Sequence, residues 1–113
     1  MKLLYFVAAI LSISASFATF ASEQGEAIFK ENGCDACHAA ARKSAGPSIK
    51  EIVAKYAGNK HAQVWLEKKV RKGGSGSFGS TSMPPIIEPT NSEIKVVVGW
   101  ILSQKLDAQH AYD

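Results

Sequence analysis

Cys34-Asp35-Ala36-Cys37-His38 is the stretch of sequence around which we expect the rest of the chain to fold. The pattern Cys-x-x-Cys-His is typical of a c-type haem attachment site. Two thiols at this spacing can each form a thioether with a haem vinyl group, and the histidine that follows is then a ligand of the iron. The motif therefore predicts one covalently bound haem c, with its iron, on this chain.

Three other interpretations of the two cysteines have to be weighed. A structural zinc site would need two more Cys or His ligands, and His61 and His110 are the only other histidines. A thioredoxin-like dithiol is expected in an α/β chain, yet no stretch alternates between apolar and polar residues. A disulfide between the two cysteines would close a very short loop and stabilise the fold little.

Length and composition are those of one globular domain. The chain has 113 residues, of which 46% are hydrophobic and 20% charged, with no repeat and no low-complexity tract. The net charge of +3 gives no indication of nucleic-acid binding. A domain this small buries a modest fraction of its surface, so a large apolar cofactor would help to build the core.

Residues 1–21 have the features of a secretory signal peptide. Lys2 supplies the positive start, residues 3–11 are an apolar run, and residues 19–21 offer small side chains for a signal peptidase. An uncleaved membrane anchor is the alternative, but serines dilute the run, and a spanning helix needs about 20 mostly apolar residues. We expect cleavage after this segment, a single domain over 22–113, and a location in the periplasm, where haem is attached after export.

The first helix of the domain is expected from about residue 23 to residue 32. Ser22 is a suitable N-cap, and Gly33 can end the helix in a left-handed conformation. The apolar face includes Gly25 and Phe29. Because glycine disfavours a helix, Gly25 makes sense if another helix crosses very close to it.

Two short helices are expected in the middle of the chain, over 49–56 and 62–72, with Gly58 ending the first of them. In the second, the apolar side chains are Val64, Trp65, Leu66 and Val70, and the charged side chains expected in solvent are Glu67, Lys68, Lys69, Arg71 and Lys72.

The last helix has the clearest pattern. Thr90 and Glu93 fit a capping box at its start, and Lys105 lies near its end. Its apolar residues recur as in an amphipathic helix and comprise Ile94, Val97, Val98, Ile101 and Leu102. No strand is predicted, so the fold class is all-α.

Met83 is the only methionine that remains after removal of the signal segment. It follows the glycine- and serine-rich loop 73–82, and two prolines stiffen the chain directly after it. Methionine usually fills gaps in a core, a role for which this position is unsuited. We therefore expect Met83 to be the second axial ligand of the iron, opposite His38. The rival ligands, His61 and His110, are expected at the surface.

Pro47 is a candidate partner of the axial histidine. Such a histidine usually donates its other ring N–H to a carbonyl, which fixes the ring. Pro47 lies in a rigid Gly46-Pro47 turn nine residues beyond His38. An ordinary loop proline explains this part of the sequence equally well.

Taken together, these fragments resemble class I c-type cytochromes, and in particular the short bacterial single-haem c-551/c-552 type. The resemblance implies a small fold of four to five short helices wrapped round one haem, with the N- and C-terminal helices crossing through Gly25, Phe29 and Trp100. The residues that carry it are Gly25, Phe29, 33–38, Gly46-Pro47, Tyr56-Ala57-Gly58, 82–85 and 99–104.

The resemblance also implies roles for individual residues. Cys34 and Cys37 would hold the haem, His38 and Met83 would bind iron, and Pro47 would orient His38. Two positions depart from the pattern, because relatives often have tryptophan at the place of Phe78 and asparagine at the place of Ile86. Both differences bear on the reduction potential, which depends on hydrogen bonding and burial around the haem.

The function implied is that of an electron carrier, not an enzyme. With both axial positions occupied, the iron has no open site and gains an electron with little rearrangement. We expect a soluble, monomeric mature form that takes electrons from a donor such as a quinol–cytochrome c reductase. Acceptors would be a terminal oxidase or a nitrite reductase. Lys43, Lys68, Lys69, Arg71 and Lys72 form either a positive docking rim or a plain solvated helix face.

Two alternative functions remain open at the level of sequence. A haem protein that reacts with peroxide or binds a gas would need a vacant iron site. A haem subunit of a larger oxidoreductase would keep the same ligands and lose free diffusion.

Overall fold

The computed structural model describes residues 19–104, so the predictions that concern Lys105, His110 and most of the signal segment lie outside the described residues. Within them the fold is all-α, as predicted, and no sheet is formed apart from an isolated bridge between Gly74 and Met83. In this part of the chain no helix is both long enough and apolar enough to cross a membrane. The elements are the first helix over 19–31, the 3₁₀ turn η1 (Cys34–Ala36), α2 (Ile49–Tyr56), α3 (Ala62–Lys72) and α4 (Asn91–Ser103).

Two capping boxes set the start of α2 and α4. Thr90 Oγ1 accepts from the Glu93 N–H, and the Glu93 carboxylate accepts from the Thr90 N–H at 2.7 Å, which confirms the box predicted there. Ser48 and Glu51 form the same reciprocal pair at α2. The sequence contains this second signature, S-x-x-E, although it was not used to predict the helix.

The first helix begins earlier than the sequence predicted. Residues 19–22 are already helical, so Ser22 lies inside the helix and does not cap it. The chain continues upstream of Ser22, and the N–H groups of this turn are therefore not the free helix end that a cap would satisfy. The other end agrees with the prediction, because the helix runs to residue 31 and Gly33 follows with φ of 68°.

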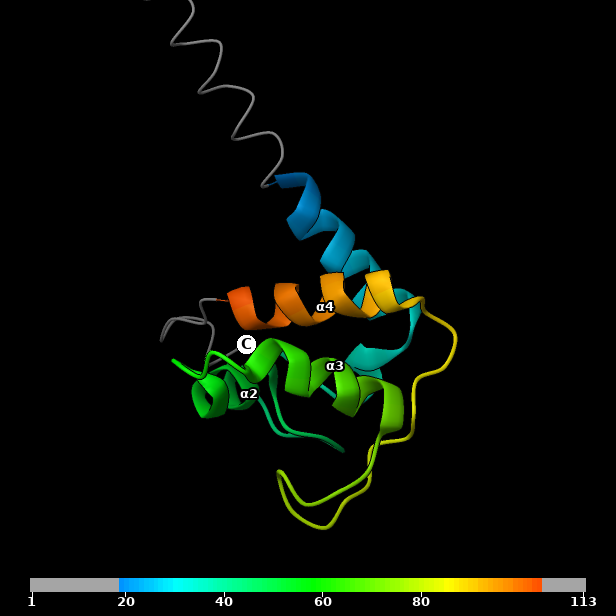
Figure 1. The fold of residues 1–113 in the computed structure, drawn as a ribbon. Coiled ribbons are helices and arrows are strands. Elements are labelled where there is room, and N and C mark those ends of the chain that lie inside the picture. The colour runs from blue at the N-terminus through cyan, green and yellow to red at the C-terminus, as the bar shows by residue number, and fades with distance from the viewer. Residues whose placement is uncertain (1–18, 105–113) are drawn as a thin grey trace, which may run out of the picture.

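The first helix crosses α4 at Gly25, as predicted. A Cβ atom on Gly25 would lie 2.3 Å from Trp100 Cβ, which is closer than two carbon atoms can approach. Phe29 lies one turn further on and packs against the same tryptophan, with ring centroids 5.2 Å apart. Figure 1 shows the first helix (blue) meeting α4 (orange) at a steep angle. The close crossing explains why a glycine is placed in the middle of a helix.

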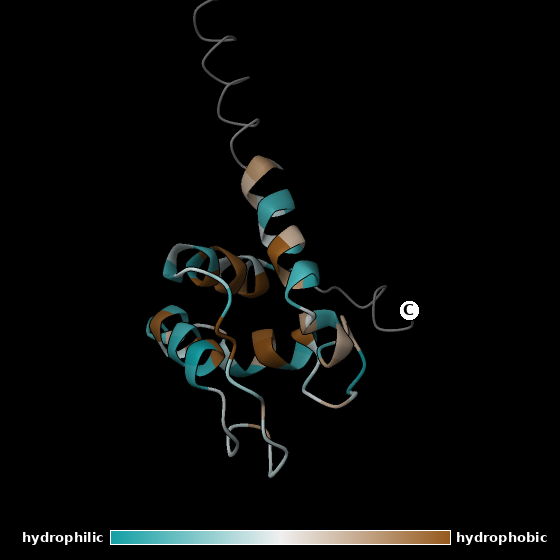
Figure 2. Ribbon diagram, turned by 90° about the vertical axis from the view of Figure 1, so that its right-hand side faces the viewer, coloured by the Kyte–Doolittle hydropathy of each residue, from teal (hydrophilic) through white to brown (hydrophobic). Residues whose placement is uncertain are grey.

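The core lies where the helices meet, and its buried members are Ile28, Phe29, Ile49, Ile94, Val97 and Val98. This confirms the apolar stripe predicted for α4. Figure 2 shows strongly apolar residues on the helices and a pale loop at the bottom, as expected of its glycines and serines.

The assignment of apolar residues on α3 was only half right. Leu66 and Val70 pack against the core, but Val64 and Trp65 are 56% and 65% exposed. Gln63 donates to the Lys95 carbonyl of α4 at 3.0 Å, which turns the face of α3 that carries residues 63, 66 and 70 toward α4. At about 100° per residue, Val64 and Trp65 then point away from that face.

Candidate haem site

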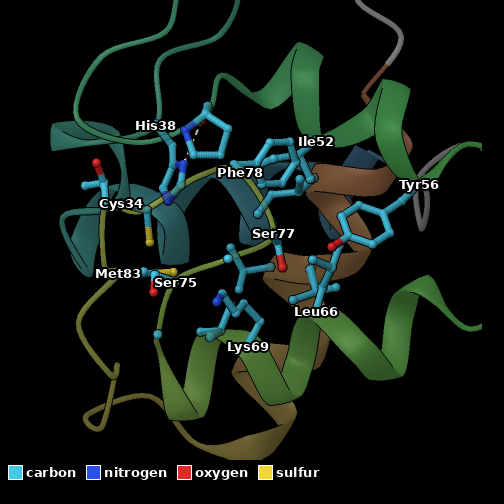
Figure 3. Close-up of a pocket in the computed structure, with 18 of the residues that line it drawn as sticks. Cys34, His38, Ile52, Tyr56, Leu66, Lys69, Ser75, Ser77, Phe78 and Met83 are labelled. Atoms are coloured by element: carbon cyan, nitrogen blue, oxygen red, sulfur yellow. Dashed lines mark hydrogen bonds between the residues drawn. The ribbon is translucent and has the colours of Figure 1, made fainter.

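A large cavity lies between the helices and the glycine-rich loop. Its volume is about 850 Å³ including the open mouth, which is within the range of small-molecule and cofactor sites. Residues from all four helices reach it, and the wall is mostly apolar. The apolar wall includes Phe29, Ile52, Leu66, Val70, Val97 and Ile101. Figure 3 shows His38 and Cys34 entering this space from above and Met83 from below.

His38 is held by the backbone around it. Its own N–H donates to the Cys34 carbonyl at 2.9 Å, and its ring Nδ1 lies 2.8 Å from the Pro47 carbonyl oxygen. A carbonyl can only accept, so Nδ1 carries the proton and donates, which leaves Nε2 as the metal-binding nitrogen. Gly46 packs against the ring, since a Cβ atom there would lie 2.8 Å from His38 Cε1.

The two cysteines lie at neighbouring parts of the site. Cys34 is half-buried and lines the large cavity, whereas Cys37 is exposed and lines a second hollow that also reaches His38 and Met83. Burial raises the pKa of the Cys34 thiol, which favours its neutral form. No disulfide joins these two described residues. The two hollows are adjacent and share lining residues, among them His38, Pro47, Phe78 and Met83.

Met83 is fixed by main-chain contacts with the end of α3. The Gly74 N–H donates to the Met83 carbonyl at 2.8 Å, and the Met83 N–H donates to the Gly74 carbonyl at 3.0 Å. These two bonds form the isolated bridge noted above. The side chain of Met83 is half-buried and lines both hollows.

Phe78, at one of the two positions that depart from the family pattern, is the centre of an aromatic cluster. Its ring packs edge-on against Tyr56 at 6.5 Å between centroids. Lys55 Nζ lies 4.5 Å above the Phe78 ring and also donates to the Ser77 carbonyl. The cluster attaches the glycine-rich loop to the end of α2. Phe78 also lines the cavity but has no polar atom to donate.

Of two residues predicted at the surface, one lines the cavity and the other does not. His61 is exposed and is not part of the wall. Lys69 was predicted in solvent but lines the cavity together with Leu66 and Val70. Helical spacing could have found it, because Lys69 is three residues from Leu66 and adjacent to Val70. Over residues 19–104 no group of three or more His, Cys, Asp or Glu side chains could hold a metal ion, so the zinc interpretation lacks a ligand set there.

The residues of the site fit a haem. The donor set is one imidazole with a free Nε2 and one thioether, which enter a common apolar space. Two thiols of the Cys-x-x-Cys-His motif lie beside that space. Cys34 and Cys37 would hold the group through thioethers, and His38 and Met83 would bind its iron, which supplies one-electron chemistry.

Comparison with known proteins gives one consistent result. The family model for cytochrome c matches residues 22–105. The chain is 46% identical to cytochrome c-552 of Hydrogenobacter thermophilus over 87 residues, which cover 77% of this chain and 85% of that protein. It is 43% identical to cytochrome c-551 of Azotobacter vinelandii over 84 residues, which cover 74% of this chain and 100% of the relative. The crystal structure of wild-type Nitrosomonas europaea cytochrome c552 superposes with a TM-score of 0.67 at 38% identity and covers 71% of this chain and 99% of that one.

Proposed function

The chain belongs to the cytochrome c family, and from this premise we propose that it is a periplasmic one-electron carrier between respiratory redox partners. Family membership makes it a haem-containing electron carrier with covalently attached haem c, and not an enzyme. The finer parts of the proposal concern the ligands, the location and the partners.

The ligand assignment has Cys34 and Cys37 as the thioether residues and His38 and Met83 as the axial ligands of iron. The observation that carries it is the placement of His38 and Met83 at one apolar cavity, with His38 already fixed by the Pro47 carbonyl. In that position Pro47 sets the ring orientation and raises the basicity of Nε2.

The surroundings of these ligands suit electron transfer. His38 and Met83 would both bind the iron, so a change of its oxidation state would require no exchange of ligands. The apolar wall would keep water from the metal, and a thioether ligand would raise its reduction potential. His38 is held through its N–H and its ring, and Met83 through its N–H and its carbonyl, which limits movement of the ligands.

The proposal places the mature protein in the periplasm, after removal of residues 1–21. Its support is the pattern of that segment and the match of the family model, which begins at residue 22. As partners we propose a quinol–cytochrome c reductase as donor and a terminal oxidase or nitrite reductase as acceptor. A monomer is the proposed state.

The test uses the full chain, expressed in a bacterium that attaches haem to exported proteins. We expect the periplasmic fraction to contain a chain that starts at Ser22 and carries the mass of one haem. Its ferric spectrum should contain the weak absorption band, near the red end, that is diagnostic of iron–sulfur ligation. A high-spin ferric spectrum at neutral pH would contradict the assignment and favour a gas-binding or peroxide-reacting haem protein.

Met83→Ala tests the sulfur ligand directly, with Ser82→Ala as the matched control at an exposed neighbour. The Met83 variant should keep its covalent haem, lose the red band and fall in potential by roughly 100 mV or more, within the span of about 0.8 V that axial ligands control. An unchanged potential would exclude Met83 as the ligand.

A further inference from the structure

Arg71 is the most heavily hydrogen-bonded side chain in the described part of the molecule. The sequence predicted it in solvent on the outer side of α3, but it is half-buried against the segment that follows Met83. Its guanidinium donates four hydrogen bonds, to the carbonyls of Ile86 (3.0 Å), Ile87 (2.8 Å) and Pro89 (2.7 Å) and to Asn91 Oδ1 (2.8 Å).

The segment that Arg71 holds makes few main-chain hydrogen bonds to α3. Residues 83–90 include three prolines, which have no N–H to donate, so the segment cannot pair as a strand along its length. The main-chain bonds that tie it to α3 are the pair between Gly74 and Met83 and the bond from the Ile86 N–H to the Val70 carbonyl at 3.0 Å.

The hydrogen bonds of Arg71 differ in kind from these main-chain bonds. A guanidinium is planar, stays charged at any working pH and makes charge-assisted hydrogen bonds that are stronger than neutral ones. Its four acceptors span residues 86–91, from just beyond the two prolines to the first residue of α4. One side chain on α3 therefore holds residues 86–91, the part of the connection that leads from the two prolines into α4.

We propose that Arg71 is a positioning residue for Met83. By fixing the segment that follows Met83 to the end of α3, Arg71 keeps the Met83 sulfur on the iron. The inference rests on the proposed function, because it takes Met83 as the axial ligand. Loss of the Arg71 bonds leaves the segment with its main-chain hydrogen bonds to Gly74 and Val70 and its packing against Gly73. The segment then opens more often, and each opening withdraws the sulfur and exposes the iron to other ligands.

Imidazole is a suitable probe, since it binds ferric haem only after Met83 has left. The experiment titrates ferric holoprotein with imidazole and compares Arg71→Gln with Lys72→Gln. Lys72 is the matched control because it is adjacent on α3 and exposed, its side chain makes no hydrogen bond within residues 19–104, and its replacement removes the same charge. We expect the apparent imidazole Kd of Arg71→Gln to fall at least tenfold and that of Lys72→Gln to stay within twofold of the parent.

If Arg71 had only a structural role, the result would be different. Arg71→Gln would then lower the denaturation midpoint without changing the imidazole affinity in native buffer. Hydrogen exchange provides the second readout, because the amides of Met83 and Ile86 should exchange at least tenfold faster in Arg71→Gln. The amides of Val97 and Val98 in the core of α4 should exchange at the rate found in Lys72→Gln.

Arg71→Lys serves if the glutamine variant does not yield holoprotein. It keeps the charge but not the planar fork, and its imidazole affinity should lie between those of the parent and Arg71→Gln. The proposal is overturned if neither Arg71 variant differs from Lys72→Gln by more than twofold. If Met83 were not the ligand at all, the unsubstituted protein would itself lack the red absorption band of sulfur ligation. That outcome is therefore distinguishable from a failure of the Arg71 proposal.

Discussion

The two sides of the cavity are built in different ways. The His38 side is closed within a short stretch of chain: the Gly46 N–H and the Ser44 hydroxyl both donate to the Cys37 carbonyl, and Pro47 accepts from the His38 ring. The Met83 side depends on α3 instead. Its segment is held through Arg71, whose partners lie 15 to 20 residues further along the chain.

This difference indicates which side of the cavity should open first. Short-range contacts close small loops at little entropic cost and form as soon as the local backbone is in place. Contacts that cross from α3 to the next segment exist only while both are folded and packed. In addition, the two thioethers proposed at Cys34 and Cys37 would belong to the His38 side. We therefore expect local opening of the site to begin at Met83.

Removal of both proposed thioether residues should have the largest effect, because it disrupts the side of the cavity that we expect to be the more stable. In Cys34→Ala/Cys37→Ala no covalent haem can form, and a cavity of about 850 Å³ with an apolar wall is left without its contents. We expect an exported chain that lacks haem by mass and has lost most of its helical circular dichroism. Met83→Ala is the comparison from the other side and should keep both haem and helices. A double variant with full apoprotein stability would refute the dependence of the fold on haem.

Gly25→Val tests the contact that joins the two sides. The first helix leads into the Cys34 turn, and α4 follows the Met83 segment, so their crossing fixes one side relative to the other. A valine would overlap the Trp100 side chain, where a Cβ atom already lies 2.3 Å away, and should cost about 3 kcal/mol of unfolding free energy in the holoprotein.

Denaturant unfolding measures this loss. Ala27→Val is the matched control, since Ala27 lies in the same helix with an exposed side chain, and its cost should be below about 1 kcal/mol from helix propensity alone. Equal losses in the two variants would mean that the crossing contributes nothing beyond propensity.

Much of the fold could be predicted from sequence because its determinants are local. The bounds of α2 and α3 and the capping box of Thr90 follow from periodicity and from short motifs. For the bond between His38 and Pro47, the sequence spacing left an ordinary loop proline equally open, and the resemblance to class I c-type cytochromes pointed to the contact that the structure has. Even the crossing at Gly25 could be inferred, from a glycine where helix propensity disfavours it.

The remainder could not be predicted because it depends on which way each helix faces. Trp65 and Arg71 are both on α3, and periodicity assigned the first to the core and the second to solvent. The structure reverses both assignments: Trp65 is 65% exposed and Arg71 is bound to four acceptors. Those acceptors are mainly backbone carbonyls of a proline-rich segment, and such a segment carries no sequence pattern that names its partner.

Gly73→Ala should loosen the Met83 side selectively. Gly73 has φ of 66°, and a Cβ atom there would lie 2.4 Å from the Met83 carbonyl oxygen. The backbone strain and the overlap together should cost about 2 to 3 kcal/mol. We expect faster exchange of the Met83 amide and tighter imidazole binding, with the His38 side unchanged.

Gly79→Ala separates strain from overlap. Gly79 also has positive φ, at 111°, nothing lies within 4 Å of the position of its Cβ atom, and it lines neither hollow. It should cost only about 1 kcal/mol, from backbone strain, and leave imidazole affinity at the parent value. If both alanine variants bound imidazole equally tightly, the contact between Gly73 and Met83 would have no part in holding the sulfur.

The smallest effects are expected at the two helix caps, one on each side of the comparison. Ser48 caps α2 directly after Pro47 and is fully buried, whereas Thr90 caps α4 after the Met83 segment and is exposed. Replacement by alanine should cost about 1 to 2 kcal/mol at Ser48 and about 1 kcal/mol or less at Thr90, measured by denaturant unfolding. Ser92→Ala, at an exposed site inside α4, should change stability by less than about 0.5 kcal/mol. Neither cap is expected to stabilise its side of the cavity much more than the other. We therefore attribute the lower stability of the Met83 side to the connection that Arg71 holds. A loss at Thr90 that clearly exceeds the loss at Ser48 would instead place that weakness at the start of α4.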